Sequence, residues 1–288
     1  MILRGALVLL AIVAGLPAAG LSAARAEDAL DRIARTGEVR LAVRPDAPPF
    51  SSRNEQGAIV GYSIDLCQAV VSELAIALNR PVTATLVEVT GANRLDAIAG
   101  GQADLLCEAT SYTLSRRERM DFSLITFVTG VVLAVRRDSP LALGYETDLP
   151  RRVGVLRGST AEAGLRQALN QTPGRSLVIP FDSHGSAIDA ILSGAVDAYA
   201  ADREIILSQM FAAGAGDLIA ISNQALSYEP YALGLPPNEP RLRLATDRAL
   251  ASLYRTGAIR DVLMKWFGER VLNDPTVRTV FRLQSIPE

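Results

Sequence analysis

Short apolar runs and helical patterns alternate along this chain, and the same order of elements occurs twice. Strands are predicted at the apolar runs 39–43, 82–89, 104–107, 153–156, 177–181 and 196–201. Helical spacing occurs between them at 63–78, 94–99 and 186–193, and a capping box from Ser159 to Glu162 begins another helix. Ser63 is the candidate N-cap of the first of these helices. Alternation of this kind predicts an α/β fold with parallel strands, built as two similar halves.

Further apolar segments connect the two halves. Thr129–Val135 and Tyr231–Leu235 are predicted to be strands, and a last helical pattern runs from Leu244 to Trp266. No strand follows that helical tail, so we expect it to pack back on the first half. The chain then crosses twice between two lobes, and a ligand would lie in the cleft that the crossing segments hinge. The expected lobes are residues 27–133 with 228–288, and residues 134–227.

The first 26 residues have the pattern of an export signal. Arg4 supplies a positive start, the run from Gly5 to Gly20 is apolar, and Ala24-Arg25-Ala26 is an A-x-A cleavage site. The run is short for a membrane span and contains Pro17, which favours a signal over an anchor. No cysteine follows the small residues, so a lipid anchor is not expected. We predict cleavage after Ala26 and a location in the periplasm.

Charge restricts the class of partner. The whole chain carries a formal net charge of −2, and residues 1–26 contain two arginines and no acid, so the mature chain carries −4. An acidic balance argues against nucleic acids and anionic membrane surfaces as partners.

Enzyme and metal signatures are few. His184 is the only histidine, which excludes metal sites built from several histidines. The chain has no G-x-S-x-G elbow, no P-loop and no G-x-G-x-x-G fingerprint. We therefore expect no metal and no cofactor. Carboxylate chemistry leaves no short motif, so these absences alone leave an enzyme open.

Arg116 is a candidate ligand for a carboxylate. Thr113 is placed to cap a helix after a strand, and Arg116 at the third helical position can reach back toward the strand end. There its guanidinium could bind a carboxylate through two hydrogen bonds, beside the Ser111 hydroxyl. Spacing alone leaves an alternative in which Arg116, Arg117 and Arg119 form a solvated helix face.

The second half has two candidate positions. The loop from Arg157 to Thr160 leads into a capped helix, whose free N–H groups can bind an anion. Asp202 follows a strand, at the end where open α/β sheets bind ligands, and its carboxylate suits an ammonium group. On local grounds Asp202 could equally cap the helix that begins at Arg203.

The chain resembles the family 3 extracellular solute-binding proteins, the amino-acid receptors of ABC importers, from about Gly37 to Gly268. The similar pieces are Arg44–Phe50, Gly57–Leu66, Gly101–Leu106, Thr113–Arg116 leading to Asp121–Ser123, Gly154–Glu162, Gly194–Ala198 with Asp202, and Lys265–Gly268. The resemblance implies a type II-like periplasmic-binding-protein fold, with two α/β lobes joined by two crossing strands. It also implies a monomer that captures an amino acid and passes it to importer permease subunits.

In such proteins the arginine at the position of Arg116 holds the ligand α-carboxylate, and the acid at the position of Asp202 takes the α-ammonium. The positions that assist the arginine are those of Ser111, Ala109 through its backbone, Ser159 and Thr160. The resemblance thus implies a zwitterion-binding site shared between the lobes.

Closer similarity is to the glutamate/aspartate-binding branch, carried by Gly61-Tyr-Ser63, Thr90–Arg94, Cys107 and Ser183-His-Gly185. In that branch the positions of Arg44, Arg94 and His184 surround the side-chain carboxylate. A buried carboxylate needs paired charge and hydrogen bonds to offset its loss of water. The alternative is that both arginines are rim charges and His184 is a loop residue.

The sequence departs from this pattern at two positions. Glu108 stands where the family often has glycine, and Ala109 replaces a frequent serine. If Glu108 points into the cleft, it would oppose an acidic ligand and favour a basic or neutral one. The main alternative function is an enzyme on the same fold, such as a periplasmic cyclohexadienyl dehydratase, with Glu108 as the suspected acid. A ligand sensor that serves a signalling partner is a third hypothesis.

Cys67 and Cys107 are the only cysteines. In an oxidising compartment an even pair can form a disulfide, and the alternative is two buried free thiols. We hypothesise a bond that joins the first helix to the strand end beside the pocket.

Overall fold

The computed structural model describes residues 27–143, 151–171 and 176–288. The predicted signal peptide and its cleavage site after Ala26 lie outside these residues. Within the described ranges, no helix combines the length and the apolar character that a membrane span requires.

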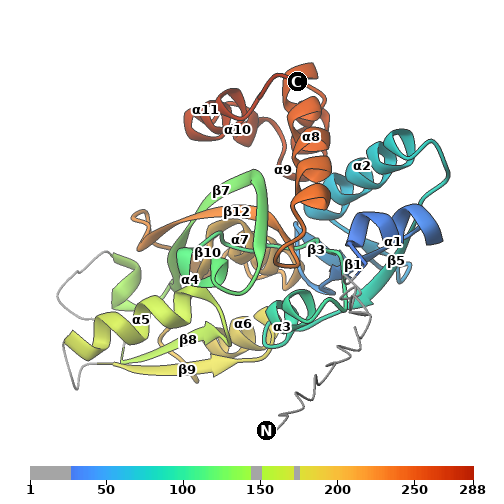
Figure 1. Ribbon diagram of the computed structural model, residues 1–288. Coiled ribbons are helices and arrows are strands. Elements are labelled where there is room, and N and C mark those ends of the chain that lie inside the picture. The colour runs from blue at the N-terminus through green and yellow to red at the C-terminus, as the bar shows by residue number, and fades with distance from the viewer. Residues whose placement is uncertain (1–26, 144–150, 172–175) are drawn as a thin grey trace, which may run out of the picture.

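One mixed sheet runs through the whole molecule, in the strand order β5-β1-β6-β12-β7-β10-β8-β9, with β11 paired to β7 (Figure 1). In the first lobe its strands are β1 (Glu38–Val43), β5 (Thr83–Glu88) and β6 (Leu105–Leu106), all parallel. In the second lobe they are β8 (Arg152–Leu156), β9 (Leu177–Phe181) and β10 (Ala198–Asp202), also parallel. The two parallel groups confirm the predicted α/β fold with a repeated half.

Helices accompany each group of strands. Those of the first lobe are α1 (Ala29–Thr36), α2 (Tyr62–Ala77), α3 (Arg94–Ala99) and α4 (Leu114–Arg117). Those of the second lobe are η1 (Pro140–Leu143), α5 (Thr160–Gln171), α6 (His184–Leu192) and α7 (Arg203–Ala212). A small separate sheet consists of β2 (Asp46–Ala47), β3 (Ser51–Arg53) and β4 (Ile59–Val60).

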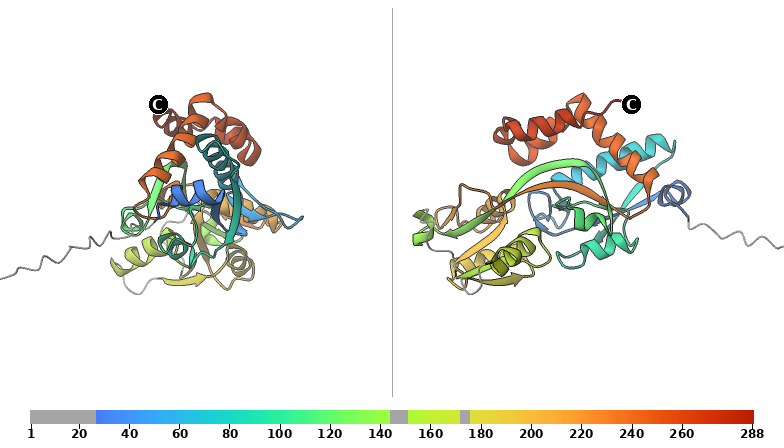
Figure 2. Two further views of the ribbon diagram at one scale, coloured as in Figure 1. Left: turned by 45° about the vertical axis from the view of Figure 1, so that its right-hand side comes forward. Right: turned by 60° about the vertical axis from the view of Figure 1, so that its left-hand side comes forward.

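Two long antiparallel strands join the lobes. They are β7 (Asp121–Arg136) and β12 (Ser227–Leu235), and β11 (Ile219–Ile221) pairs with the far end of β7. The right-hand view of Figure 2 shows β7 and β12 as curved ribbons that run from one lobe into the other. β7 is longer than the predicted strand Thr129–Val135, because its first half pairs with β12 inside the first lobe.

The tail returns to the first lobe, as predicted. It forms α8 (Pro240–Thr256), α9 (Ile259–Phe267), α10 (Glu269–Leu272) and α11 (Pro275–Leu283). Figure 1 shows α8 and α9 beside α2, with α10 and α11 on the other side of α8, and buried Leu242, Leu250 and Leu263 share a core with Leu66 and Leu74 of α2. The single helical pattern from Leu244 to Trp266 is broken at Gly257, where α8 ends.

One local prediction was wrong. Helix α2 begins at Tyr62 with Gly61 as its N-cap, so Ser63 lies inside the helix, where its buried hydroxyl donates to the Glu108 carbonyl at 3.0 Å. Gly61 has φ 154°, and a Cβ there would lie 2.1 Å from the Phe50 carbonyl oxygen. This close approach of two backbone segments fixes where the helix starts.

A disulfide joins Cys67 of α2 to Cys107, the residue after β6, with 6.2 Å between their Cα atoms. Both side chains are fully buried. The bond therefore fixes α2 to the strand end that carries Glu108 and Ala109.

Replacing both cysteines with alanine is expected to lower the free energy of unfolding by about 4 kcal/mol, from the chain entropy of a loop of this length. The sequence separation is 40 residues. Urea unfolding of the ligand-free protein measures the loss, and thiol labelling of the oxidised, unfolded wild type supplies the control. Two reactive thiols in that control would contradict the bond.

Candidate functional site

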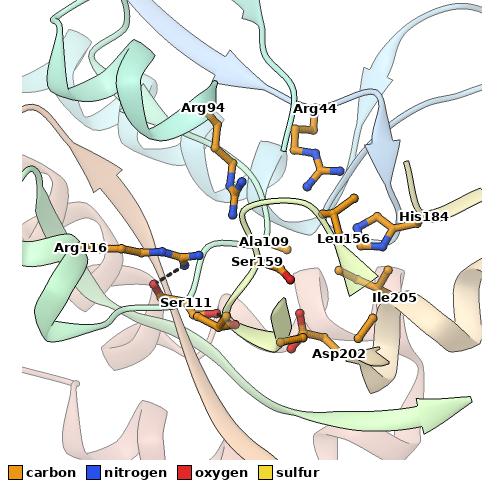
Figure 3. A pocket seen from close by; sticks show the side chains of 13 residues that line it. Arg44, Arg94, Ala109, Ser111, Arg116, Leu156, Ser159, His184, Asp202 and Ile205 are labelled. Atoms are coloured by element: carbon orange, nitrogen blue, oxygen red, sulfur yellow. Dashed lines mark hydrogen bonds between the residues drawn. The ribbon is translucent and has the colours of Figure 1, made fainter. Parts of the chain in front are cut away.

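A cavity of about 20 Å³, the space of about one or two water molecules, lies between the lobes. All nine residues that the sequence predicted to bind a ligand line it (Figure 3): Arg44, Arg94, Ala109, Ser111 and Arg116 from the first lobe, and Ser159, Thr160, His184 and Asp202 from the second. Leu156, Ala161, Ala201 and Ile205 complete the lining. These four were missed, because small and apolar residues of strands and helices carry no signal that separates lining from core.

The lobes meet at Gly158, in the loop between β8 and α5. Its carbonyl oxygen accepts from Arg94 Nη2 at 3.3 Å and from Arg116 Nη2 at 3.4 Å. Gly158 has φ 71°, and a Cβ there would lie 3.1 Å from the Gly91 carbonyl oxygen. The close approach brings the start of α5 against two first-lobe arginines.

Arg116 points to the cavity, whereas its neighbours do not. Thr113 caps α4 as predicted, and its hydroxyl accepts from the Arg116 backbone N–H at 3.2 Å. Arg116 Nη1 donates to the Ser111 carbonyl oxygen at 2.9 Å, the dashed line in Figure 3. Arg117 and Arg119 are exposed and pair with acids outside the cavity. The alternative of one shared solvated face is therefore wrong for Arg116.

The Arg116 guanidinium lies in a low-dielectric setting. Burial, and then the positive charge of Arg94, lower the pKa of Arg116 to about 10. The group is still a cation at neutral pH. A cation that has lost its water is strongly attracted to an incoming carboxylate.

Ser159 caps the start of α5 as predicted, but the return bond of Glu162 goes to Gly158 instead of Ser159, so the capping box is only half formed. Ser159 Oγ accepts from the Glu162 backbone N–H at 3.1 Å, and Glu162 Oε2 accepts from the Gly158 N–H at 2.8 Å. Thr160 Oγ1 lies 3.4 Å from Ser111 Oγ across the cleft and donates to Glu229 Oε2 at 2.9 Å.

Glu229 of β12 is 5 % exposed and was missed by sequence reasoning. It follows no motif, and only the pairing of β12 with β7 brings it beside α5. Its contact with Thr160 holds that hydroxyl at the cavity.

Asp202 ends β10 and precedes α7, but its side chain makes no capping hydrogen bond. Its buried Oδ1 has no hydrogen-bond partner among the described residues. Burial raises the pKa of the Asp202 carboxyl to about 7, although the nearby Tyr231 hydroxyl opposes the rise. The local alternative, a helix cap, is therefore not what this carboxyl does.

Arg44 and Arg94 are buried, not rim charges, with 2 % and 3 % of their surfaces exposed. Arg44 binds Asp46 through Nε and Nη2, both at 2.9 Å. Glu108, which is 1 % exposed, lies 3.6 Å from Arg44 Nη1 and 3.1 Å from Arg94 Nε. Both guanidinium groups point toward the cavity in Figure 3, whereas Glu108 does not line it.

His184 begins α6 and is buried rather than placed in a loop. Its Nδ1 lies 2.6 Å from the Tyr199 hydroxyl, and its Nε2 has no hydrogen-bond partner among the described residues. Burial, with Arg44 and Arg94 nearby, holds the pKa of His184 well below its ordinary value. The imidazole at the cavity is therefore neutral.

No group of three or more potential metal ligands occurs in the part of the chain that the structure describes. The cavity instead combines three arginines, the Asp202 carboxyl, one neutral imidazole and hydroxyl groups. Such a set can bind a small zwitterion through its two charged groups.

Comparison with known proteins gives consistent matches. The model of the bacterial extracellular solute-binding proteins, family 3, matches residues 39–269. The glutamate/aspartate import solute-binding protein of Escherichia coli is 27% identical over 263 residues, which cover 91% of this chain and 87% of that protein.

Among solved structures, a mutant of the arginine-binding protein ArgBP from T. maritima gives a TM-score of 0.73 at 25% identity, over 83% of this chain and 98% of that one. The ancestral amino-acid-binding protein AncCDT-1, a precursor of cyclohexadienyl dehydratase, gives 0.71 at 23% identity, over 83% and 99%. The second likeness shows the fold alone.

Proposed function

Because this chain belongs to the bacterial extracellular solute-binding proteins of family 3, we propose that it captures a free α-amino acid and delivers it to an ABC importer. The proposed location is the periplasm, after removal of residues 1–26 by cleavage following Ala26. The proposed partners are the amino acid and the permease subunits of the importer, with the receptor acting as a monomer.

One observation carries this proposal: Arg116 of the first lobe and Asp202 of the second line the same small cavity. In the proposed complex the guanidinium holds the α-carboxylate, with the Ser111 hydroxyl, the Ala109 backbone and the start of α5 at Ser159 and Thr160. The Asp202 carboxylate, which has a buried oxygen without a partner among the described residues, holds the α-ammonium. Each ligand charge then meets an opposite charge out of water.

The other end of the cavity supports a polar ligand side chain. Arg44, Arg94 and His184 line that end and offer hydrogen-bond donors. Glutamate, aspartate or a similar polar amino acid fits this set. The name of the Escherichia coli relative, a glutamate/aspartate import protein, supports the same class at 27% identity.

Closure around the ligand follows from the two crossing strands. We propose that residues 27–133 with 228–288 move against residues 134–227, with β7 and β12 as the hinge. Separate core clusters support the division: one contains Leu41, Leu105 and Leu250, and another contains Ile188, Tyr199 and Ile219. Closure removes water and strengthens each charged contact, and the importer would bind the closed form.

A binding screen of the mature protein tests the function. A free amino acid that binds only the folded state raises Tm by mass action, and calorimetry then gives its Kd. The N-acetyl and α-amide derivatives of the best ligand serve as controls, since each removes one of the two charges. We expect neither derivative to raise Tm. A screen in which no amino acid shifts Tm would reject the proposal.

The chain is a binding protein rather than an enzyme, since it belongs to a family of solute-binding proteins and relatives that match it are named as import or amino-acid-binding proteins. The enzymatic alternative gave Glu108 the role of a cleft acid. Glu108 instead pairs with Arg44 and Arg94 and does not line the cavity. Incubation with prephenate or arogenate is expected to yield no aromatic product by absorbance.

A further inference from the structure

We infer that Glu108 makes the side-chain end of the cavity electrically neutral, so that the receptor prefers an uncharged hydrogen-bonding side chain, a carboxamide in particular, over glutamate or aspartate. This inference rests on the proposed function and narrows its ligand class.

The charges that pair with one another at this end balance: three of them are buried, and the fourth, on Asp46, is 29 % exposed. Arg44 and Arg94 supply two positive charges, and Asp46 and Glu108 supply two negative ones in direct contact with them. Arg44, Arg94 and Glu108 are each at most 3 % exposed, so water does not screen them. Each guanidinium thus already has a carboxylate partner within the protein.

An acidic side chain would add a third negative charge without a third positive one. His184 is neutral, because burial and the two arginines disfavour its cation. Arg116 is the partner of the α-carboxylate, and the buried Glu229 adds a further acid near it. A ligand carboxylate would therefore be buried in excess, which is costly in a low dielectric.

The arginines disfavour ligands with a basic or an apolar side chain. Guanidinium groups line this end, while Glu108 is absent from the lining residues, so a basic side chain would meet cations. An apolar side chain would leave buried donors without acceptors. A carboxamide oxygen can accept from Arg44 or Arg94 without adding charge.

Glu108 is held so that it cannot turn away from the arginines. The Thr110 hydroxyl donates to its Oε1, and the Ser63 hydroxyl donates to its backbone carbonyl at 3.0 Å. The preceding residue, Cys107, is bonded to α2. The negative charge is therefore a fixed part of the site.

The wild-type protein gives the first test. Calorimetry at neutral pH compares glutamine with glutamate and asparagine with aspartate, pairs that differ little in shape but by one charge. We expect the amide of the tighter-binding pair to bind at least about tenfold more tightly than its acid. Equal or tighter binding of the acid overturns this inference and leaves the proposed function standing. If no amino acid binds, the proposed function itself fails.

Glu108→Gln gives the second test, because it keeps the shape and removes the charge. The Kd ratio of acid to amide is expected to shift at least about tenfold in favour of the acid. Glu204→Gln is the matched control: this half-buried acid accepts from Thr129 and does not line the cavity, so the ratio stays unchanged. An unchanged ratio in Glu108→Gln, or an equal shift in the control, overturns the inference.

A double variant covers the case in which Glu108→Gln leaves the arginines unpaired and fails to fold. Arg94→Gln with Glu108→Gln removes one charge of each sign and leaves the balance unchanged. We expect it to keep the preference for the amide. A preference for the acid in this variant contradicts charge balance as the cause.

Discussion

Replacing Arg116 with alanine is expected to weaken amino-acid binding about thirtyfold or more. Removing one partner of a buried charge pair costs about 2–5 kcal/mol, and each 1.4 kcal/mol is tenfold in Kd. The guanidinium lies at the cavity, has lost much of its water and is aligned by the Ser111 carbonyl at 2.9 Å. Calorimetry with the best ligand of the wild type measures the loss.

Two further variants make the Arg116 result specific. Arg119→Ala removes an exposed guanidinium that follows the same short helix and pairs with Asp96, so Kd stays within about twofold of the wild type. Arg116→Lys keeps the charge but cannot form two parallel hydrogen bonds to a carboxylate, so we expect affinity to fall about tenfold. If Arg116→Ala folds and binds as tightly as Arg119→Ala, Arg116 does not hold the α-carboxylate.

Asp202→Asn is expected to weaken amino-acid binding above pH 7 about as much as Arg116→Ala does. It also changes how the affinity depends on pH. The pKa of the wild-type carboxyl is about 7, and the ligand ammonium binds its ionised form. Wild-type affinity is therefore constant well above pH 7 and falls about tenfold per pH unit well below it. The variant cannot ionise, so its affinity is weak at every pH. Calorimetry from pH 5.5 to pH 8 measures both profiles.

Asp182→Asn is the control for this series, because Asp182 is exposed and pairs only with Arg157 among the described residues. Its pH profile is expected to follow that of the wild type. A wild-type affinity that does not change between pH 5.5 and pH 8 contradicts the role of Asp202.

The Asp202 carboxyl also affects the stability of the ligand-free protein. Affinity rises with pH, whereas the stability contributed by this group falls. Its pKa is raised on folding from 3.8 to about 7, so between these values the folded chain binds more protons than the unfolded one. The free energy of unfolding therefore falls as pH rises from about 4 to about 7, by several kcal/mol at most. Asp202→Asn removes this contribution, and urea unfolding at pH 5 and pH 8 measures the difference.

Much of the fold could be predicted because its signals are local. Strand runs such as 39–43 and the helix cap at Ser159 depend on residues close together in the sequence. The predicted start of α2 at Ser63 was wrong for the opposite reason. The helix starts where Gly61 approaches Phe50, and this tertiary contact leaves no local signal in the sequence.

Nine of the residues that line the cavity were named from ordered motifs that resemble a family, and their roles as ligand-binding groups stay predictions. Two local choices could not be made from spacing. Arg116 had to be separated from Arg117 and Arg119, and Asp202 could have been a helix cap. In both cases the local sequence allows the side chain either to face the cavity or to serve the neighbouring helix. Only the packing of the folded chain decides between these two positions.

By itself the sequence determined the repeated α/β pattern, the acidic balance of the chain and which side chains can carry charge, because these depend on residue type and short-range periodicity. Tertiary structure alone decided which charges meet. The packing of β1, β6 and α3 brings Glu108 between Arg44 and Arg94, and β12 brings Glu229 to Thr160. Coulombic energy depends on distance and burial in space, and neither quantity is fixed by position along the chain.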